Sequence, residues 1–445
     1  MAAATGQEAL AASRATALLG TIVDNAGVVR CKVVPRRRLE SITTTGVGLS
    51  PVFAVMAADD HLTAAPGLDT PSGDMRLVPD LGAAAPLDEQ GRLWWAPCDQ
   101  LDQEHRPMPI CQRTVLATLE REAAAAGWSY RMSFEVEFTL LRDGEPVHRG
   151  PGYGAHALLE QEGFALDLLR ALEAAGLAVE QFHPEYSLGQ FEVSVAPAAP
   201  TAAADRLVLL RLLVARTAQR HGLRVSFAPV VLPGEVGNGC HLHFSLWDAH
   251  GNTMAGGAGP LGMQPAGCQA LAGLLQHLPE LTAVLTPSVL SYQRLQPSHW
   301  SGAYACWGHE NREAALRLVA ATGASGPASA NCELKPVDSA SNPYLVAACV
   351  LAATQHGLRR NARLPEPVRV DPHQLSDQER ADRGVRRLPD DLGKAVAAAE
   401  ASSLLREALG APLLDAFLAV RRDELERFGG LDVAEAVAAL WWRYA

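Results

Sequence analysis

The pattern of hydrophobic and polar positions changes character near residue 100. Before that point, residues 7–19 have helical spacing, and residues 21–34 and 51–56 form short apolar runs. A stretch rich in Pro, Gly and Asp follows at residues 66–73. Short apolar runs between turn residues predict a small β-rich domain, and polar residues with two prolines at 99–109 mark its end.

After this boundary, segments with helical and strand periods alternate. The predicted helices are 113–127, 164–176, 202–222, 342–360 and the tail from 402, which a Gly-Gly pair at 429–430 interrupts. The predicted strands are 132–141, 190–195, 224–231 and 241–247. Alternation of this kind predicts an α/β or α+β catalytic domain. The polar segment 371–391 is predicted to be a loop or flap.

Composition narrows the class of protein. The 445 residues are 48% apolar, which is enough for a large core and two domains, predicted as residues 1–105 and 106–445. The net charge of −11 argues against nucleic-acid binding, and no apolar run is long enough to span a membrane. The eight cysteines are scattered without a CxxC pair, which indicates reduced thiols and a cytoplasmic location.

Acidic and histidine positions in the middle of the chain form a candidate metal cage. They are Glu135 and Glu137 in SFEVEF, Glu185 and Glu192 in PEYSLGQFE, His241 in NGCHLHFS, and Glu333 in CELKPVD. Five carboxylates and one imidazole suit hard divalent cations, Mg²⁺ or Mn²⁺, better than zinc. Such cations mostly hold phosphates, so the cage indicates ATP chemistry.

The spacing of these positions supports a shared site, although each motif has an ordinary structural explanation. Glu135 and Glu137 are two apart on a predicted strand and therefore face the same side. A turn at Ser-Leu-Gly brings Glu185 and Glu192 together in a hairpin. Taken singly, a solvated strand explains Glu135 and Glu137 equally well, a solvated hairpin is the commoner explanation for Glu185 and Glu192, and a core histidine is the commoner explanation for His241 or His243.

Basic residues follow in a neutral, aromatic setting. Arg294, Arg312 and Arg317 offer planar donors that suit carboxylates and phosphates, although any one of them is also consistent with a surface salt bridge. Glu333 and Lys335 place a carboxylate and a cation two residues apart. An exposed ion pair at the start of a helix is the alternative for that pair.

In this order, the motifs resemble the glutamine synthetase family over nearly the whole chain. The matching stretches are the ExE strand, GQFE after PEY, NGCHLHFS, the NR…R segment and ExK…D…NPYL. The resemblance implies an N-terminal β-grasp domain and a catalytic domain whose antiparallel-rich sheet forms a partial barrel. It also implies homo-oligomers, typically dodecamers of two hexameric rings, with each active site between neighbouring subunits.

The resemblance also implies roles for individual residues. Carried over by position, one cation is held by Glu137, Glu185 and Glu192, and the second by Glu135, His241 and Glu333. The residues beside the nucleotide phosphates are His243, Ser245, Arg312 and Arg317. Arg294 binds the amino-acid carboxylate, and Asn238 and Gly239 bind the glutamate backbone. Lys335 stands near the γ-phosphoryl group, where the family usually has Arg. The implied cofactors are ATP and two or three divalent cations, and the implied reaction forms an amide through an acyl phosphate.

Two departures from the family concern the nitrogen nucleophile. Trp300 occupies the place of a flap glutamate, and residues 46–50 lack the aspartate of an FDGSS-like segment, so both groups that recognise ammonium are missing. We therefore predict an ATP-dependent γ-glutamyl–amine ligase that uses an alkyl amine, polyamine, ethanolamine or hydrazine. The alternatives are ordinary glutamine synthetase using ammonia, a ligase for another acid, and a non-catalytic structural relative.

Overall fold

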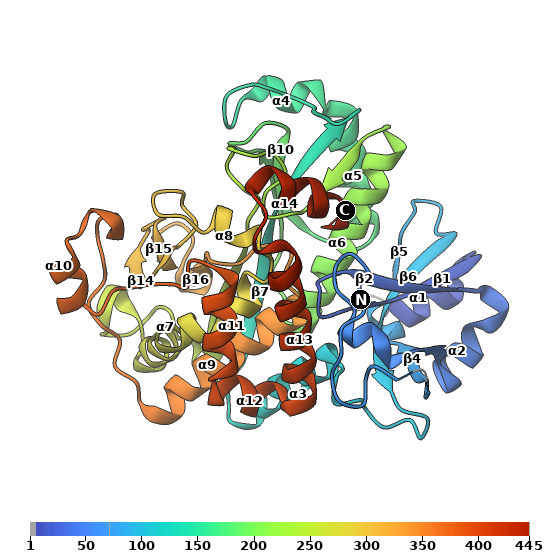
Figure 1. Ribbon diagram of the computed structural model, residues 1–445, viewed down its shortest axis with the longest axis horizontal. Helices are drawn as coiled ribbons and strands as arrows, with labels where there is room; N and C mark the ends of the chain where they lie inside the picture. Colours follow the sequence, from blue (N-terminus) through green and yellow to red (C-terminus); the bar gives the residue numbers. More distant parts are fainter. Residues whose placement is uncertain (1–5, 71, 445) are drawn as a thin grey trace.

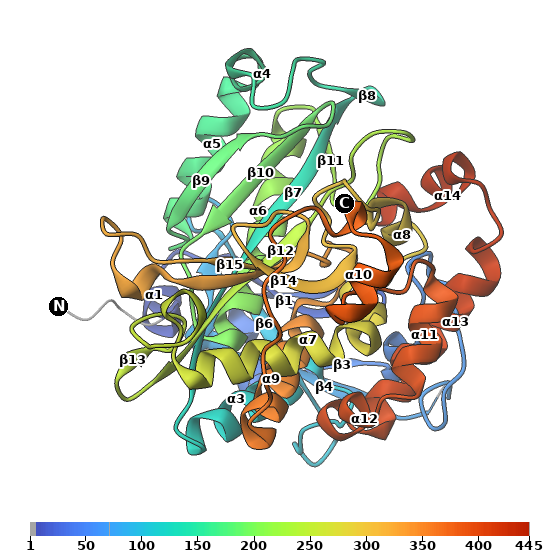
Figure 2. The same ribbon diagram turned by 90° about the vertical axis from the view of Figure 1, so that its left-hand side faces the viewer.

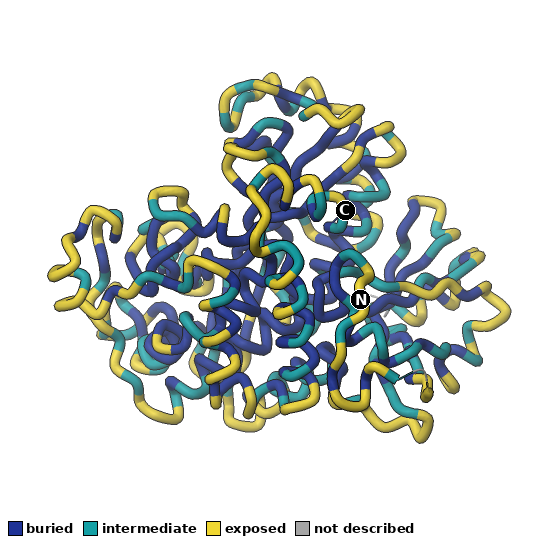
Figure 3. The backbone as a smooth tube through the Cα atoms, viewed as in Figure 1, coloured by how far each residue is buried: buried dark blue, intermediate teal, exposed yellow. Residues whose placement is uncertain are grey.

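The structure is a computed structural model that describes residues 6–70 and 72–444. Its strands form two sheets. The first sheet is built from residues 17–101, which lie together on one side of the molecule (Figure 1, blue). The second sheet is larger, is built from residues 129–387, and is surrounded by most of the helices. Figure 3 shows buried backbone at the centre of the molecule and exposed backbone at its edges.

The first sheet has the order β2-β1-β6-β4-β3, with β5 paired to β6. Its strands are β1 (Ala17–Val23), β2 (Val29–Pro35), β3 (Val47–Leu49), β4 (Met75–Pro79), β5 (Ala85–Pro86) and β6 (Leu93–Leu101), and α1 (Gly6–Ala12) and α2 (Leu39–Thr45) accompany them. The β-rich character predicted for this region is confirmed. Its assignment as a separate β-grasp domain that ends at residue 105 stays a prediction.

Adjacent tryptophans on β6 show how this sheet joins the rest of the molecule. Successive side chains of a strand point to opposite faces. Trp94 packs in a small cluster with Leu10 and Leu18, whereas Trp95 belongs to the main core of the molecule. One face of the first sheet is therefore continuous with the core that surrounds the second sheet.

The helix predicted over residues 7–19 is too long. Helix α1 ends at Ala12, and the Ser13 hydroxyl, which donates to Leu10 O at 2.7 Å and accepts from Ala15 N at 3.1 Å, ends the helical hydrogen bonding. Residues 17–23 instead form β1, which pairs with β2 on one side and β6 on the other. In residues 17–23, Ala and Leu favour a helix whereas Thr, Ile and Val favour a strand, so pairing to two strands decides the conformation.

The second sheet has the order β17-β14-β15-β16-β12-β7-β10-β9, with β8, β11 and β13 attached. Its strands are β7 (Ser129–Arg142), β8 (Glu145–Pro146), β9 (Val179–Pro184), β10 (Gln190–Val195), β11 (Arg224–Ser226), β12 (Cys240–Asp248), β13 (Gly251–Asn252), β14 (Tyr304–His309), β15 (Ala314–Val319), β16 (Asn331–Leu334) and β17 (Arg386–Arg387). Its strand pairs are antiparallel, apart from the parallel pair of β14 and β15. The predicted α+β class, with an antiparallel-rich sheet in a partial barrel, is confirmed (Figure 2).

Helices cover the second sheet. They are α3 (Gln112–Ala125), α4 (Ala155–Glu160), α5 (Glu162–Ala174), α6 (Pro200–Arg220), α7 (Pro265–Leu285), α8 (Ser291–Arg294), α9 (Pro343–Arg360), α10 (Asp377–Asp382), α11 (Leu392–Glu400), α12 (Ser403–Leu409), α13 (Ala411–Phe428) and α14 (Val433–Leu440). The predicted helices 113–127, 164–176, 202–222 and 342–360 match α3, α5, α6 and α9, and the helical tail is also confirmed.

Helix α9 is the central helix of the core. The Asn342 side chain caps it by accepting from the N–H groups of Tyr344 and Leu345, Pro343 begins it, and it ends at Asn361, which has a left-handed φ of 49°. An apolar sequence on all sides of a helix indicates full burial. Accordingly, α3, α6, α7 and α12 pack around α9.

Two further predicted segments differ from the structure. Strand β11 stops at Ser226, because the Ser226 hydroxyl donates to Trp441 O and Phe227 N donates to Tyr444 O at 2.7 Å, which draws the chain out of the sheet. The segment 371–391 is not only a loop. It contains α10, which begins with a capping box between Ser376 and Glu379.

All eight cysteines are free thiols. No helix within residues 6–70 and 72–444 has the length and apolar character needed to cross a membrane.

Candidate active site

Neighbouring strands of the second sheet bring the predicted cage residues together. Strand β7 carries Glu135 and Glu137, and the register pairs Glu137 with Glu192 on β10 and Glu135 with His241 on β12. Glu333 on β16 completes the row, because it pairs with His243 on β12. The alternation of β-strands puts these side chains on one face. Residues far apart in the sequence thus meet because their strands are adjacent.

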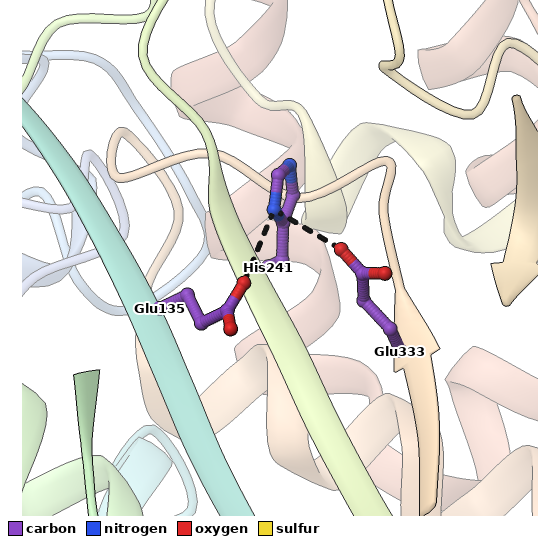
Figure 4. Close-up of side chains that lie close together, drawn as sticks. All are labelled: Glu135, His241 and Glu333. Atoms are coloured by element: carbon purple, nitrogen blue, oxygen red, sulfur yellow. Dashed lines mark ion pairs between the residues drawn. The ribbon is translucent and has the colours of Figure 1, made fainter. Parts of the chain in front are cut away.

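One cluster of possible metal ligands consists of Glu135, His241 and Glu333 (Figure 4). One ligand atom from each residue lies within 4.8 Å of the others, and the three side chains come from β7, β12 and β16. His241 Nδ1 lies 3.7 Å from Glu135 Oε2 and 3.3 Å from Glu333 Oε1. This is the set that the sequence assigned to one cation.

A second cluster of possible metal ligands consists of His183, Glu185 and Glu192. His183 is not among the ligands predicted from the sequence. Its Nδ1 lies 3.4 Å from Glu185 Oε1 and its Nε2 lies 3.3 Å from Glu192 Oε1. The register of β9 against β10 places His183 directly opposite Glu192. The predicted third member, Glu137, lines the same cavity.

Glu137 lies between the two clusters. Its Oε2 accepts hydrogen bonds from Gly239 N at 2.8 Å and Gln190 Nε2 at 2.9 Å, while its Oε1 lies 3.9 Å from His241 Nε2. Burial, and then the negative charge of Glu192, raises the pKa of Glu137 to about 8. Without a cation, Glu137 therefore holds a proton at neutral pH.

The charges around Glu333 have the opposite effect. Burial, the largest single effect, would raise the pKa of this carboxyl, but the positive charge of Lys335 together with the neighbouring histidines outweighs burial, and the pKa is held well below its usual range. Lys335 Nζ is 2.9 Å from Glu333 Oε1, and Arg317 Nη1 is 3.1 Å from Glu333 Oε2. Burial and the charge of Lys335 lower the pKa of His241 to about 4. His241 is therefore neutral, so one of its two ring nitrogens carries a lone pair; its Nδ1 is the nitrogen that lies near Glu135 and Glu333.

Two further arginines have groups that remain available for substrate. Buried Arg294 donates through Nη2 to His241 Nε2 at 2.9 Å and to Lys335 O at 3.3 Å, while its Nη1 has no hydrogen-bond partner among the described residues. Exposed Arg312 forms no ion pair within the described part of the chain. Both residues line the cavity, so each offers a guanidinium to an anion.

The cavity that these groups line has a volume of about 630 Å³. Three exposed aromatic side chains also line it, and Tyr186 contacts the other two. The ring of Tyr186 meets Trp300 edge to face with centroids 5.2 Å apart, and it meets Tyr153 in the same way at 5.3 Å. The Tyr153 hydroxyl donates to Glu185 Oε1 at 2.6 Å. The site thus combines acidic, basic and aromatic walls.

Three predicted site residues, Asn238, Gly239 and Ser245, do not line the cavity. The Asn238 amide donates to Ala228 O at 2.9 Å and accepts from Gln190 Nε2 at 3.0 Å, and Ser245 accepts from Trp247 Nε1 at 2.9 Å. A Cβ at Gly239 would lie 2.6 Å from His241 Nε2, so only glycine fits there. The roles of these residues toward glutamate and nucleotide stay predictions.

Sequence reasoning missed His183, Tyr153, Tyr186 and Gln190. A signal existed for His183, which is two residues before Glu185, so that extended backbone across these positions would put both side chains on one face. Tyr186 follows Glu185 directly, but no periodicity indicates that its ring reaches Trp300, more than one hundred residues away. Tyr153 lies in a loop and had no comparable signal.

Comparisons with known proteins fit this geometry. A profile described as "Glutamine synthetase, catalytic domain" matches residues 109–435. The γ-glutamylpolyamine synthetase GlnA3 of Streptomyces coelicolor is 46% identical over 450 residues, a match that covers 97% of each chain. A solved structure of a novel glutamine synthase homolog superposes with a TM-score of 0.87 at 31% identity, over 97% of this chain and 99% of the other. The ADP complex of GmaS superposes with a TM-score of 0.83 at 29% identity, over 96% and 97%.

Proposed function

The chain belongs to the glutamine synthetase family, and from this premise we propose that it joins the γ-carboxylate of L-glutamate to a polyamine or similar alkyl amine, using ATP. The chain is an ATP-dependent ligase that forms γ-glutamyl amides with an amine other than ammonia. What we add is the class of amine and the residues that bind each substrate. One relative carries γ-glutamylpolyamine synthetase as its name, which supports the choice of amine.

The two clusters suit two divalent cations, one in each. Each cluster offers two carboxylate oxygens and one imidazole nitrogen within 4.8 Å, a donor set that fits Mn²⁺ or Mg²⁺. When bound, such cations would neutralise the charge that develops on the transferred phosphoryl group. We assign Glu135, His241 and Glu333 to one cation, and Glu185 and Glu192, with His183 or Glu137, to the other.

The chain's own basic residues orient the two anionic substrates. Arg294 lines the cavity, and its Nη1 is a buried donor without a partner among residues 6–70 and 72–444, so its guanidinium is suited to the α-carboxylate of glutamate. Arg312 and Arg317 are suited to the phosphates of ATP. Lys335, buried beside Glu333, provides a positive charge where the γ-carboxylate attacks the terminal phosphoryl group. This attack displaces ADP and gives an acyl phosphate, which the amine then attacks with loss of phosphate and a proton.

The aromatic wall carries the assignment of the amine. Trp300 is 45% exposed and Tyr186 and Tyr153 are also exposed, yet Tyr186 contacts the other two rings and all three line one cavity. Contiguous exposed aromatic surface indicates a binding site, and ring faces attract alkylammonium groups. The net charge of −11 would further attract a polycation. Ammonia has neither a chain nor a distal charge with which to use this wall.

A phosphate-release assay tests this proposal. ATP, glutamate and a divalent cation are supplied with ammonia, ethylamine, ethanolamine, putrescine, cadaverine, spermidine or spermine, and mass spectrometry identifies the product. We expect kcat/KM for the best di- or polyamine to exceed that for ammonia by at least ~10²-fold. Turnover of ammonia equal to that of every amine would instead favour ordinary glutamine synthetase.

We also propose that the protein is a homo-oligomer of rings in the cytoplasm, as its family membership implies. Light scattering should then give a mass that is a multiple of the 47.3 kDa chain, with twelve copies as the expected number for two hexameric rings. A fully active monomer would contradict this assembly.

A further inference from the structure

The segment that carries Trp300 has an unusual backbone. It follows α8, and both Ser298 and Trp300 have left-handed conformations, with φ of 59° and 52°. Residues with a Cβ rarely adopt such angles, and when they do, the surrounding structure must hold them there. A second group is therefore needed to explain why Trp300 stays in this position.

Glu313 is that group. Its side chain is 9% exposed, and its Oε1 accepts a hydrogen bond from Trp300 N at 2.9 Å. The backbone of Ser298 also hydrogen-bonds to this carboxylate. Both left-handed residues thus direct their amides at one buried anion, and hydrogen bonds between an N–H group and a carboxylate are among the stronger ones.

Glu313 is itself fixed by its surroundings. Its own N–H donates to Asn311 Oδ1 at 3.0 Å, and Asn311 Nδ2 donates to Val368 O at 2.9 Å. The backbone of Glu313 is therefore connected through Asn311 to Val368, which lies outside the segment that carries Trp300. A carboxylate on a backbone fixed in this way can restrain a segment that would otherwise relax.

The ring of Trp300 is held on two further sides. It meets Tyr186 edge to face at 5.2 Å, and the guanidinium carbon of Arg312 lies 5.7 Å from its centre. Arg312 and Glu313 are consecutive, so one short segment holds both the ring and the backbone of Trp300. The result is a defined aromatic wall on the cavity.

We propose that Glu313 is a positioning residue for the amine: its carboxylate holds the backbone of Trp300 so that the indole forms the amine-binding wall with Tyr186. This inference rests on the proposed function, because it assigns the wall to the amine. Glu313 itself is not among the residues that line the cavity, so it acts through Trp300. Its loss should therefore affect the amine and leave the other two substrates largely untouched.

Steady-state kinetics with spermidine test the proposal. Glu313→Ala should raise the KM for spermidine by ~10-fold or more while the KM values for glutamate and ATP stay within about 2-fold. Glu313→Gln, which keeps an acceptor oxygen at the same reach, should restore most of the affinity. Glu313→Asp, which keeps the charge but shortens the reach, should behave like Glu313→Ala. These two variants decide between position and charge even if the alanine variant does not fold.

A double-mutant cycle tests the route of action. If Glu313 acts through Trp300, Glu313→Ala should add little to the effect of Trp300→Ala on the KM for spermidine. Effects that multiply, equal losses for all three substrates, or a Glu313→Asp enzyme that matches wild type would each overturn the positioning role. If wild type turns over ammonia but no polyamine, the proposed function fails instead, and the same cycle measured with ammonia still shows whether Glu313 acts through Trp300.

Discussion

The charge of Glu137 depends on its burial and on its acidic neighbours. Two hydrogen bonds fix its Oε2, and the carboxylates of Glu185 and Glu192 oppose its ionisation. A divalent cation would remove that opposition and release the proton. The close approach of like charges, which is unfavourable in the free protein, is therefore the property that favours a bound cation.

Replacing Glu137 with alanine should lower turnover by at least ~10²-fold, the scale that follows loss of one key electrostatic group. The reason is that the variant removes the carboxylate that joins the two clusters. Phosphate release with glutamate, spermidine and Mg²⁺ measures the effect. Glu180→Ala is a matched control, since Glu180 is an exposed glutamate on β9 outside the cavity lining, and it should retain wild-type turnover. Normal activity of Glu137→Ala would contradict the assignment of the site.

Trp300→Glu should shift the preference from polyamines toward ammonia. Ammonium is mostly protonated at neutral pH, so an enzyme that uses it needs a carboxylate to bind and deprotonate it. We expect kcat/KM for ammonia to rise by ~10-fold and that for spermidine to fall by at least as much, given cation–π contacts of ~0.5–2 kcal/mol. Trp300→Phe keeps an aromatic face and should stay close to wild type. A variant that gains nothing with ammonia would count against Trp300 as the discriminating residue.

At the scale of elements, the hairpin of β9 and β10 helps to position Glu137. Gln190 at the start of β10 donates to both Glu137 and Asn238. Buried His148 lies beside it, with Nε2 3.4 Å from Gln190 O and its ring edge to face with Phe191 at 5.3 Å. The position of Glu137 thus depends on a histidine that lies outside the cavity.

His148 should make the stability of the protein sensitive to acid. Burial lowers the pKa of His148 below its ordinary value of 6.5, so the unfolded chain binds the proton more tightly than the folded chain. Its contribution to stability is therefore full above pH 6.5 and is lost as the pH falls through the lowered pKa. The slope is at most about 1.4 kcal/mol per pH unit. Thermal melts from pH 5 to 8 should show a smaller pH dependence for His148→Leu than for wild type; identical slopes would refute this.

At the scale of the whole molecule, Arg113 on α3 connects the first sheet to the helices of the second. It contacts Asp80 and Asp99 from the first sheet region at 2.6 and 2.9 Å, and it forms a bidentate pair with Asp205 on α6 at 3.0 Å. Tyr344 of α9 donates to the same Asp205 at 2.8 Å. The two parts of the molecule therefore share one network of charges, which is buried at Arg113 and Asp205.

Arg113→Ala should destabilise the protein by about 3–5 kcal/mol, because it leaves buried Asp205 without its cation. Chemical denaturation measures the change in the free energy of unfolding. Arg106→Ala is the matched control, since Arg106 forms only exposed ion pairs and should leave the stability nearly unchanged. Equal effects of the two substitutions would show that the network does not hold the parts together.

The sequence by itself determined the features that depend on local pattern. An Asn-Pro start and an apolar run defined α9, alternation put Glu135 and Glu137 on one face of β7, and the Ser-Leu-Gly turn produced the β9–β10 hairpin. The order of the motifs was enough to give the family and the class of reaction. Local patterns suffice for these features because helical and strand periods arise from backbone geometry alone.

Only the tertiary structure decided which residues meet. The register of β7 between β10 and β12 sets Glu137 against Glu192 and Glu135 against His241, and pairing to two strands turns residues 17–23 from predicted helix into β1. The contacts of His183 with Glu192 and of Glu313 with Trp300 were likewise visible only in the fold. The physical reason is that a period fixes which way a side chain points, whereas its partner depends on long-range packing of the whole core.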